Sequence, residues 1–289
     1  MEADWFDVRN SMTTANHRTG HPGLLGGLIG RWRLPRPADL KGFPVNDPEV
    51  PTPEPTPTPG HSIFFDRKLV MLKRRLVREA TGAISMLERA IDALWRLDRQ
   101  AAAEVRRIDD TIDREEVEIE QECFNLLTLH HVFARDFRVV AFVLKVNHDI
   151  ERVADHASSI AKIVGKIEGD IPPAWPTSLI ELGQRVPVRC HELLRAVLDE
   201  DVEAARSLVA KDKTIDGLDD RLFGETIDFM GHEGATPGGL TNGLLIYRAG
   251  RELERVGDLM SNIAEEVIYL ATGDIIRHSH KRPGIQRSA

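Results

Sequence analysis

The sequence predicts an all-α protein made of two tandem three-helix bundles, preceded by a disordered Pro-rich N-terminal tail. Hydrophobic residues make up 42% of the 289 residues and charged residues 29%, as in ordinary globular proteins. Aromatic residues make up only 6%, whereas the helix-favouring residues Leu, Ala, Glu and Arg are abundant. Apolar residues also recur at steps of three and four, and the same series of helical segments occurs twice.

Residues 1–60 differ in composition from the rest of the chain. From Pro48 to Pro59 (PEVPTPEPTPTP), proline alternates mostly with Thr or Glu, a pattern that favours the extended polyproline conformation. A segment of this composition cannot bury a hydrophobic core. We therefore expect a disordered tail here, in preference to a docking segment.

The first bundle is expected over residues 61–169. Leucines such as Leu72, Leu76 and Leu87 share one face of its first helix, which Asp98 should end. The apolar periodicity predicts three helices in this part of the chain, at about 61–98, 101–129 and 134–167. Long helices with short connections indicate an up-down-up arrangement.

The second bundle is expected over residues 170–273, followed by a C-terminal tail at 274–289. Its first helix should be kinked or shortened at Pro187, because proline lacks the N–H that a helix interior needs. The periodicity again predicts three helices, at about 177–198, 202–230 and 240–271.

The two bundles are an internal repeat in a constant register. The segment that begins at Asp109 (DDTID) matches the one at Asp212 (DKTID), and 212 − 109 is 103. The segment that begins at Asp149 (DIERVAD) matches the one at Glu252 (ELERVGD), again 103 residues later. Two motifs about 40 residues apart share one offset, so no net insertion separates them, and a chance match is a poor explanation.

Both motifs carry Asp/Glu pairs four residues apart. Side chains at this spacing lie on one helix face, where like charges repel. If the second and third helices of each bundle face each other, four carboxylates converge and either raise their pKa values or bind cations. The alternative for any single pair is a solvated surface, but the duplication of all four pairs favours metal binding. The predicted ligands are Asp109, Asp113, Glu151 and Asp155 in the first bundle and Asp212, Asp216, Glu254 and Asp258 in the second.

Glu116 and Asp219, which lie further along the second helices, are possible additional ligands. All-oxygen ligation suits hard ions such as Mg²⁺, Mn²⁺, Ca²⁺ or Fe³⁺. Asp149 and Glu252 should face elsewhere and rank lower. His148 and His156 have Arg251 and Leu259 as counterparts, so a symmetric site cannot require them, and we expect them around the site or on the surface.

Several classes of function lack their sequence signals. The net charge of −8 argues against nucleic-acid binding, and no apolar run is long enough for a transmembrane helix. The motifs HExxH, GxxxxGK[ST], GxSxG and Glu-x-x-His are absent, which argues against zinc proteases, P-loop nucleotide binding, serine hydrolases and di-iron oxygen chemistry. The two cysteines are far apart and the N-terminus does not resemble a signal peptide, so we expect a cytoplasmic protein.

Over about residues 61–273 the chain resembles the PhoU family of phosphate-signalling regulators. The segments DIERVADHASSIA (149–161) and ELERVGDLMSNIAEEVIYLAT (252–272) closely resemble the paired PhoU signature, and HSIFFDRKL (61–69) and the Asp109–Asp113 segment are also similar. The doubled ERV[AG]D motif is specific, whereas a single copy would not be. The N-terminal extension is not part of the family core.

The resemblance implies two pseudo-symmetric three-helix bundles whose E(D)xxxD motifs bind iron, zinc, magnesium or manganese at the eight acids named above. It implies a cytoplasmic homodimer that restrains phosphate uptake and the phosphate-starvation response. The implied partners are the phosphate ABC transporter, through its ATPase subunit, and a phosphate-sensing histidine kinase. The leading interpretation is thus a regulator without enzymatic activity. A metal-dependent hydrolase and a metal-independent helical scaffold are the alternatives.

Overall fold

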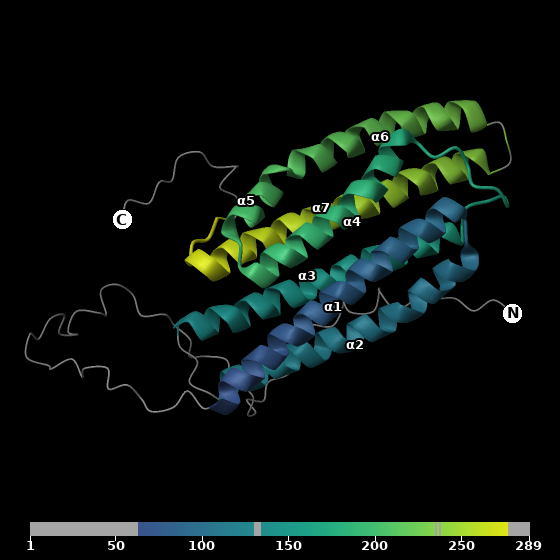
Figure 1. Cartoon of the computed structure of the whole chain (residues 1–289). Helices are drawn as coiled ribbons and strands as arrows, with labels where there is room; N and C mark the ends of the chain where they lie inside the picture. Colours follow the sequence, from purple (N-terminus) through teal and green to yellow (C-terminus); the bar gives the residue numbers. More distant parts are fainter. Residues whose placement is uncertain (1–62, 130–133, 235, 237, 277–289) are drawn as a thin grey trace, which may run out of the picture. The chain divides into compact units, whose positions relative to one another are not determined.

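Helices account for the regular structure in the computed structural model, which describes residues 63–129, 134–234, 236 and 238–276 (Figure 1). The predicted tail at 1–60 and most of the predicted C-terminal tail lie outside these residues. The helices are α1 (Ile63–Arg96), α2 (Arg99–Leu129), α3 (Ala134–Val164), α4 (Thr177–Asp199), α5 (Val202–Ala210), α6 (Asp212–Glu233) and α7 (Gly239–Thr272). The described residues contain no strand, and the predicted all-α fold is confirmed.

The corner between the first two helices of each half is built in the same way. Asp98 follows the end of α1, as expected, and its N–H donates to the Ala93 carbonyl of that helix. It also caps α2, because its Oδ1 accepts hydrogen bonds from the N–H groups of Gln100 and Ala101. In the second half, 103 residues later, Asp201 Oδ1 accepts from Ala204 N at 3.0 Å. Each capping aspartate satisfies N–H groups that the start of a helix leaves without a partner.

The single helix predicted over about 202–230 is wrong, because the chain there forms α5 and α6. At Lys211 the backbone tightens to φ −79° and ψ −2°, and Thr214 N donates to the Lys211 carbonyl three residues back. The break puts Asp212 and Asp216 at the start of α6. Helix N-termini carry partial positive charge, so acids are more stable there than in the interior of a long helix. Pro187, by contrast, lies inside an unbroken α4.

The two halves pack against each other through their last helices. α1 and α2 pack on α3, α4 to α6 pack on α7, α3 contacts α7, and α1 contacts α4 (Figure 1). Where α1 meets the second half, the rings of Trp95 and Trp175 lie 5.5 Å apart, edge to face. A Cβ at Gly183 would lie 2.5 Å from the Trp95 ring, so glycine permits this close approach.

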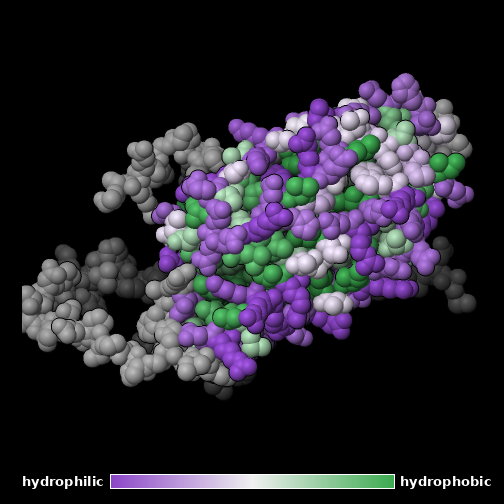
Figure 2. Space-filling view, viewed as in Figure 1, coloured by the Kyte–Doolittle hydropathy of each residue, from purple (hydrophilic) through white to green (hydrophobic). Residues whose placement is uncertain are grey.

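Hydrophobic side chains fill the space between the helices. Leu72, Leu87 and Leu94 of the predicted apolar stripe are among the fully buried residues. On the face seen in Figure 2, hydrophobic residues gather along the middle of the molecule, between more hydrophilic margins. Within residues 63–129, 134–234 and 238–276, no helix is both long and apolar enough to cross a membrane.

Candidate metal centres

In the first half, the predicted acids lie along the seam where α2 packs against α3. Asp109 and Glu151 are half-buried, whereas Asp113 and Asp155 are exposed at the edge of the seam. Burial raises the pKa of Asp109; a neighbouring serine hydroxyl opposes this change, and the charges of Asp113 and Asp155 add to it. Acids from two different helices therefore act on the same carboxyl group.

Glu151, on α3, is influenced by acids of both α2 and α3. Burial raises its pKa, Asp155 raises it further, His148 opposes the increase, and Glu116 and Asp113 add to it. The possible ligand Glu116 is thus close enough to Glu151 to repel it. The first half therefore gathers acids from α2 and α3 in a partly desolvated place, where their mutual repulsion costs free energy in the absence of a cation.

In the second half, the equivalent acids lie between α6 and α7 and come closer together. Asp216, Glu254 and Asp258 each offer one ligand atom, and these atoms all lie within 4.8 Å of one another. No other three His, Cys, Asp or Glu groups of the described chain are grouped this closely. The side chain of Asp212 lies outside what the structure describes.

Repulsion between the acids of this second set contributes to a raised pKa of Glu254. Burial raises its pKa, Asp258 adds to the increase, Arg251 opposes it, and Asp219 and Asp216 raise it further. Asp219 is mostly buried, and its Oδ1 has no hydrogen-bond partner. Its other oxygen, Oδ2, accepts from Arg251 Nη1 at 2.8 Å, and the same nitrogen lies 3.3 Å from Glu254 Oε2.

The equivalent contact in the first half involves a histidine. His148 Nδ1 lies 3.7 Å from both Glu116 Oε1 and Glu151 Oε2. It therefore borders the acids, as expected, without a short contact to either. Neither His148 nor Arg251 belongs to the acidic motif itself, yet each lies beside two acids of its half, Glu116 and Glu151 in the first and Asp219 and Glu254 in the second.

Glu79 on α1 was missed at the level of sequence. Its side chain is only 2% exposed, and neither of its carboxylate oxygens has a hydrogen-bond partner. Burial raises its pKa to about 8, with Glu115, Glu116 and Glu151 adding to the increase and Arg75 opposing it. No motif around Glu79 points to this role, because its burial depends on how α1 packs against the other two helices.

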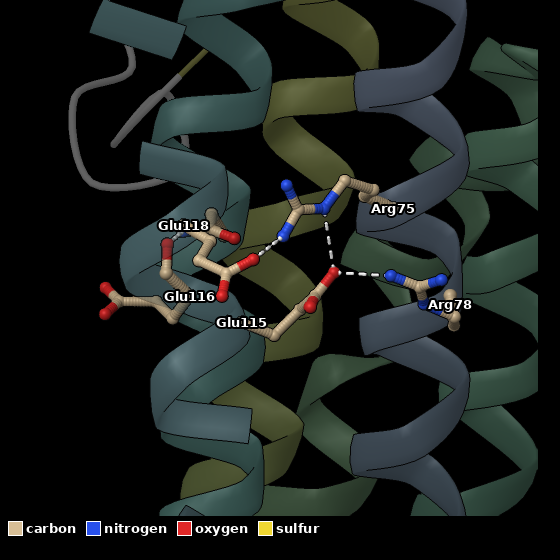
Figure 3. A network of polar contacts seen from close by, with 6 residues as sticks. Arg75, Arg78, Glu115, Glu116 and Glu118 are labelled. Carbon is tan, nitrogen blue, oxygen red and sulfur yellow. Dashed lines mark hydrogen bonds and ion pairs between the residues drawn. The ribbon is translucent and has the colours of Figure 1, made fainter. Parts of the chain in front are cut away.

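The arginines of α1 near Glu79 are engaged elsewhere. Arg75 donates from Nε to Glu115 Oε1 at 2.9 Å and from Nη2 to Glu118 Oε2 at 2.6 Å, and Arg78 Nη2 donates to Glu115 Oε1 at 2.8 Å. Figure 3 shows both arginines reaching from α1 to these glutamates on α2, with Glu116 directed away from them. Arg75 and Arg78 are thus paired with Glu115 and Glu118, and neither forms a hydrogen bond with Glu79.

A second missed pair joins the two halves. His156 Nδ1 lies 2.7 Å from Glu252 Oε2, and the two side chains are 12% and 7% exposed. Glu252 was expected to face away from its site and His156 to lie around a site or on the surface. Glu252 does face away from the grouped acids of its own half: it meets His156 between α3 and α7, one residue from Asp155 and two residues from Glu254. The pair therefore connects the helices that carry both acidic sets, which the sequence did not indicate.

The side chains present fit a hard metal ion. Both sets are made of carboxylate oxygens, the donors that Mg²⁺, Mn²⁺ and Fe³⁺ prefer. The buried Asp219 Oδ1 and both Glu79 oxygens have no hydrogen-bond partner, which is costly for such groups unless a cation or a proton satisfies them. Each half thus offers carboxylate donors of the kind that a hard cation prefers.

Comparison with known proteins identifies one domain family in both halves. The PhoU domain matches residues 76–164 and again residues 179–267. These two ranges are 103 residues apart (179 − 76), the same register as the acidic motifs. The two matched ranges contain all eight predicted ligands.

Relatives match across the same region of the chain. A Pseudomonas aeruginosa protein named phosphate-specific transport system accessory protein PhoU homolog is 34% identical over 216 residues, which are 74% of this chain and 88% of that protein. A protein of the same name from Deinococcus radiodurans is 32% identical over 188 residues, 65% of this chain and 87% of that one.

Solved structures agree with these matches. The crystal structure of PhoU from Pseudomonas aeruginosa superimposes with a TM-score of 0.67 and 31% identity, and the match covers 73% of this chain and all of that one. The phosphate transport system regulatory protein PhoU from Streptococcus pneumoniae gives a TM-score of 0.65 at 26% identity, with 73% and 98% covered.

Proposed function

Because the chain belongs to the PhoU family, we propose that it is an accessory regulator of phosphate transport that binds metal ions at its two sets of helix-seam acids. The observation that carries the proposal is the repetition of these acids, in one register, at α2–α3 and at α6–α7. The names of the relatives describe accessory and regulatory proteins of phosphate transport, not enzymes.

The acids have a physical reason to bind cations. In the first half, Asp109, Asp113, Glu151 and Asp155 would hold the ions, and Asp212, Asp216, Glu254 and Asp258 would hold them in the second. Bound cations would supply the positive charge that offsets repulsion between carboxylates on neighbouring helices. The chain's own contribution is to keep these acids at helix seams, so that binding favours one arrangement of the helices over looser ones.

We further propose that this arrangement forms the surface for protein partners. The family resemblance points to the ATPase subunit of the phosphate ABC transporter and to a phosphate-sensing histidine kinase, with negative regulation of uptake and of the starvation response as the outcome. A homodimer in the cytoplasm is part of the same proposal. Metal binding would then act on partners through helix arrangement, without a catalytic step.

Elemental analysis of the purified full chain tests the metal proposal most directly. We expect bound iron, zinc, magnesium or manganese, with reduced content in Asp113→Ala and in Asp216→Ala. Asp110→Ala and Asp220→Ala are matched controls, because both side chains are exposed on the same helices and neither belongs to the predicted ligands. Equal metal content in all five proteins would contradict the assignment of these acids.

Partner docking needs a separate measurement. The transporter ATPase subunit should be retained by metal-loaded protein and lost, or clearly weakened, after chelation. A phosphatase assay on the loaded protein distinguishes the hydrolase alternative. If chelated protein kept both its thermal stability and its affinity for the ATPase subunit, metal control of docking would be wrong.

A further inference from the structure

The two acid-bearing seams differ in the residue that lies beside their glutamates. With the register of 103 residues, Arg251 of the second half corresponds to His148 of the first. Each precedes the glutamate of its acidic motif, Glu254 or Glu151, on the same helix. An arginine keeps its charge at every pH at which proteins fold, whereas a histidine side chain commonly loses its charge near neutral pH. Equivalent positions thus carry a permanent cation in one half only.

Arg251 joins the two helices of the second seam. From α7, its Nη1 lies 2.8 Å from Asp219 Oδ2 on α6 and 3.3 Å from Glu254 Oε2 on its own helix. Both acidic side chains are 13% exposed, so water screens these contacts poorly. One guanidinium therefore offsets negative charge on both helices and links them.

The same half holds its acids closest together. Ligand atoms of Asp216, Glu254 and Asp258 lie within 4.8 Å of one another, and the first half has no such close group among its described residues. Carboxylates at this distance repel one another, and Arg251 contacts one of the three. The close grouping and the permanent cation thus occur in the same half.

The matching place of the first seam has no permanent cation. His148 is 65% exposed, and its Nδ1 lies 3.7 Å from Glu116 on α2 and from Glu151 on α3, beyond hydrogen-bond distance. No lysine or arginine of the described chain forms an ion pair with either glutamate. Asn147 donates to the Glu116 carbonyl at 2.9 Å, but this bond leaves the carboxylate charges unchanged. Lys162, which acts on the acids at the other end of the seam, lies about 16 Å along α3 from Glu151.

We propose that Arg251 takes the place of a cation at the α6–α7 seam, so that bound metal orders the α2–α3 seam and adds little order to α6–α7. The inference rests on the proposed metal binding and deepens it, because it assigns metal control of the helix arrangement to the first half. The second half still binds a hard cation through its grouped acids, and Arg251 is a positioning residue beside them. The surface that metal controls then lies on α2 and α3.

Hydrogen–deuterium exchange of the full chain, first with a chelator and then with Mn²⁺, tests the inference. Equilibrium dialysis gives the Kd for Mn²⁺, and the ion is then used at about ten times the weakest Kd. An ion that binds only the closed arrangement slows amide exchange in proportion to its concentration over Kd, which is about tenfold here. We expect this slowing in peptides of α2 and α3, and a change below about twofold in α6 and α7.

Exchanging the two residues between the halves provides the sharpest comparison. Arg251→His should make exchange in α6 and α7 as dependent on Mn²⁺ as exchange in α2 and α3, and His148→Arg should remove most of this dependence from α2 and α3. Arg251→Lys keeps the charge and should behave as the unaltered chain does. Arg221→His is the matched control, because Arg221 is an exposed residue of α6 that lies near Glu181 of α4, and it should change neither seam.

Circular dichroism without metal establishes that the variants are folded. Should Arg251→His fail to fold, His148→Arg still tests the inference, because it alters an exposed side chain. Equal slowing in both seams that is unchanged in Arg251→His, or full dependence on Mn²⁺ in His148→Arg, would overturn the inference and leave metal binding intact. Absence of Mn²⁺ binding by the unaltered chain in equilibrium dialysis would instead refute the proposed function as well.

Discussion

Replacing Glu79 with glutamine should stabilise the metal-free protein, by an amount that grows with pH. Burial raises the pKa of Glu79 from an ordinary 4.5 to about 8, with Glu115, Glu116 and Glu151 adding to the increase and Arg75 opposing it. The folded state therefore holds a proton that the unfolded state releases. When the pKa of a carboxyl group is higher in the folded than in the unfolded state, the stability that its protonated form contributes is fully present below the unfolded pKa. This contribution is lost as pH rises through the folded pKa.

The expected size follows from these two pKa values. Compared with a Glu79 that stays protonated in both states, the ionisable side chain should lower the free energy of unfolding. The decrease should be about 1 kcal/mol at pH 5, about 3 kcal/mol at pH 7 and about 5 kcal/mol at pH 9. Glutamine has no proton to lose, so this dependence should disappear in Glu79→Gln. The difference in unfolding free energy between the two proteins should therefore widen by about 4 kcal/mol from pH 5 to pH 9.

Urea unfolding followed by circular dichroism, with a chelator present, measures this difference. Curves at pH 5, 7 and 9 for the unaltered chain, Glu79→Gln and the exposed control Glu118→Gln would provide it. Other acids of the seam titrate in the same direction, but they are common to all three proteins and cancel in the comparison. Stability profiles of the unaltered chain and Glu79→Gln that run parallel from pH 5 to pH 9 would refute the reasoning.

Three further substitutions test contacts elsewhere in the fold, each by urea unfolding. His156→Leu should destabilise the protein by about 3 kcal/mol, because the buried Glu252 carboxylate loses its 2.7 Å contact from the other half and keeps only the longer contacts with Arg248 and Arg255. Gly183→Ala should cost about 1–2 kcal/mol, because the new methyl group would meet a rigid indole ring 2.5 Å away. Asp98→Ala should cost about 1 kcal/mol through loss of the cap of α2.

Each of these variants has a control or an opposing result. Gly224→Ala lies in open space on α6 and should raise stability by about 0.5–1 kcal/mol, through better helix propensity alone. Equal effects at Gly183 and Gly224 would contradict the close packing of α1 on α4. An Asp98→Ala variant as stable as the unaltered chain would mean that water caps the helix equally well. An unaffected His156→Leu would mean that Arg248 and Arg255 compensate Glu252 without the histidine.

Features that depend on near neighbours in the chain were predictable from the sequence. The helices and their apolar faces follow from local periodicity, and the duplicated register follows from matching short motifs 103 residues apart. The family matches at 76–164 and 179–267 keep the same offset. The spacing of Asp216 relative to Asp212, and of Glu254 relative to Asp258, likewise predicted which acids share a helix face. Propensity alone did not reveal the break at Lys211, because no glycine or proline marks it.

The burial of Glu79 and the contact between His156 and Glu252 could not be predicted in this way. Glu79 lies on a different helix from the acids that act on it, and His156 meets Glu252 from the other half of the chain. No short segment contains either relationship, and a buried glutamate on an amphipathic helix has the same sequence signal as an exposed one.

By itself, the sequence determined the helices, their repetition and the positions of eight acids along them, because these can be read from spacings of three to seven residues and from motifs that recur 103 residues later. Only the tertiary structure decided which of these acids are buried, which have a cation beside them, and how the halves differ. Those properties depend on distances between helices and on exclusion of water at their seams, which arise only when the bundles are packed.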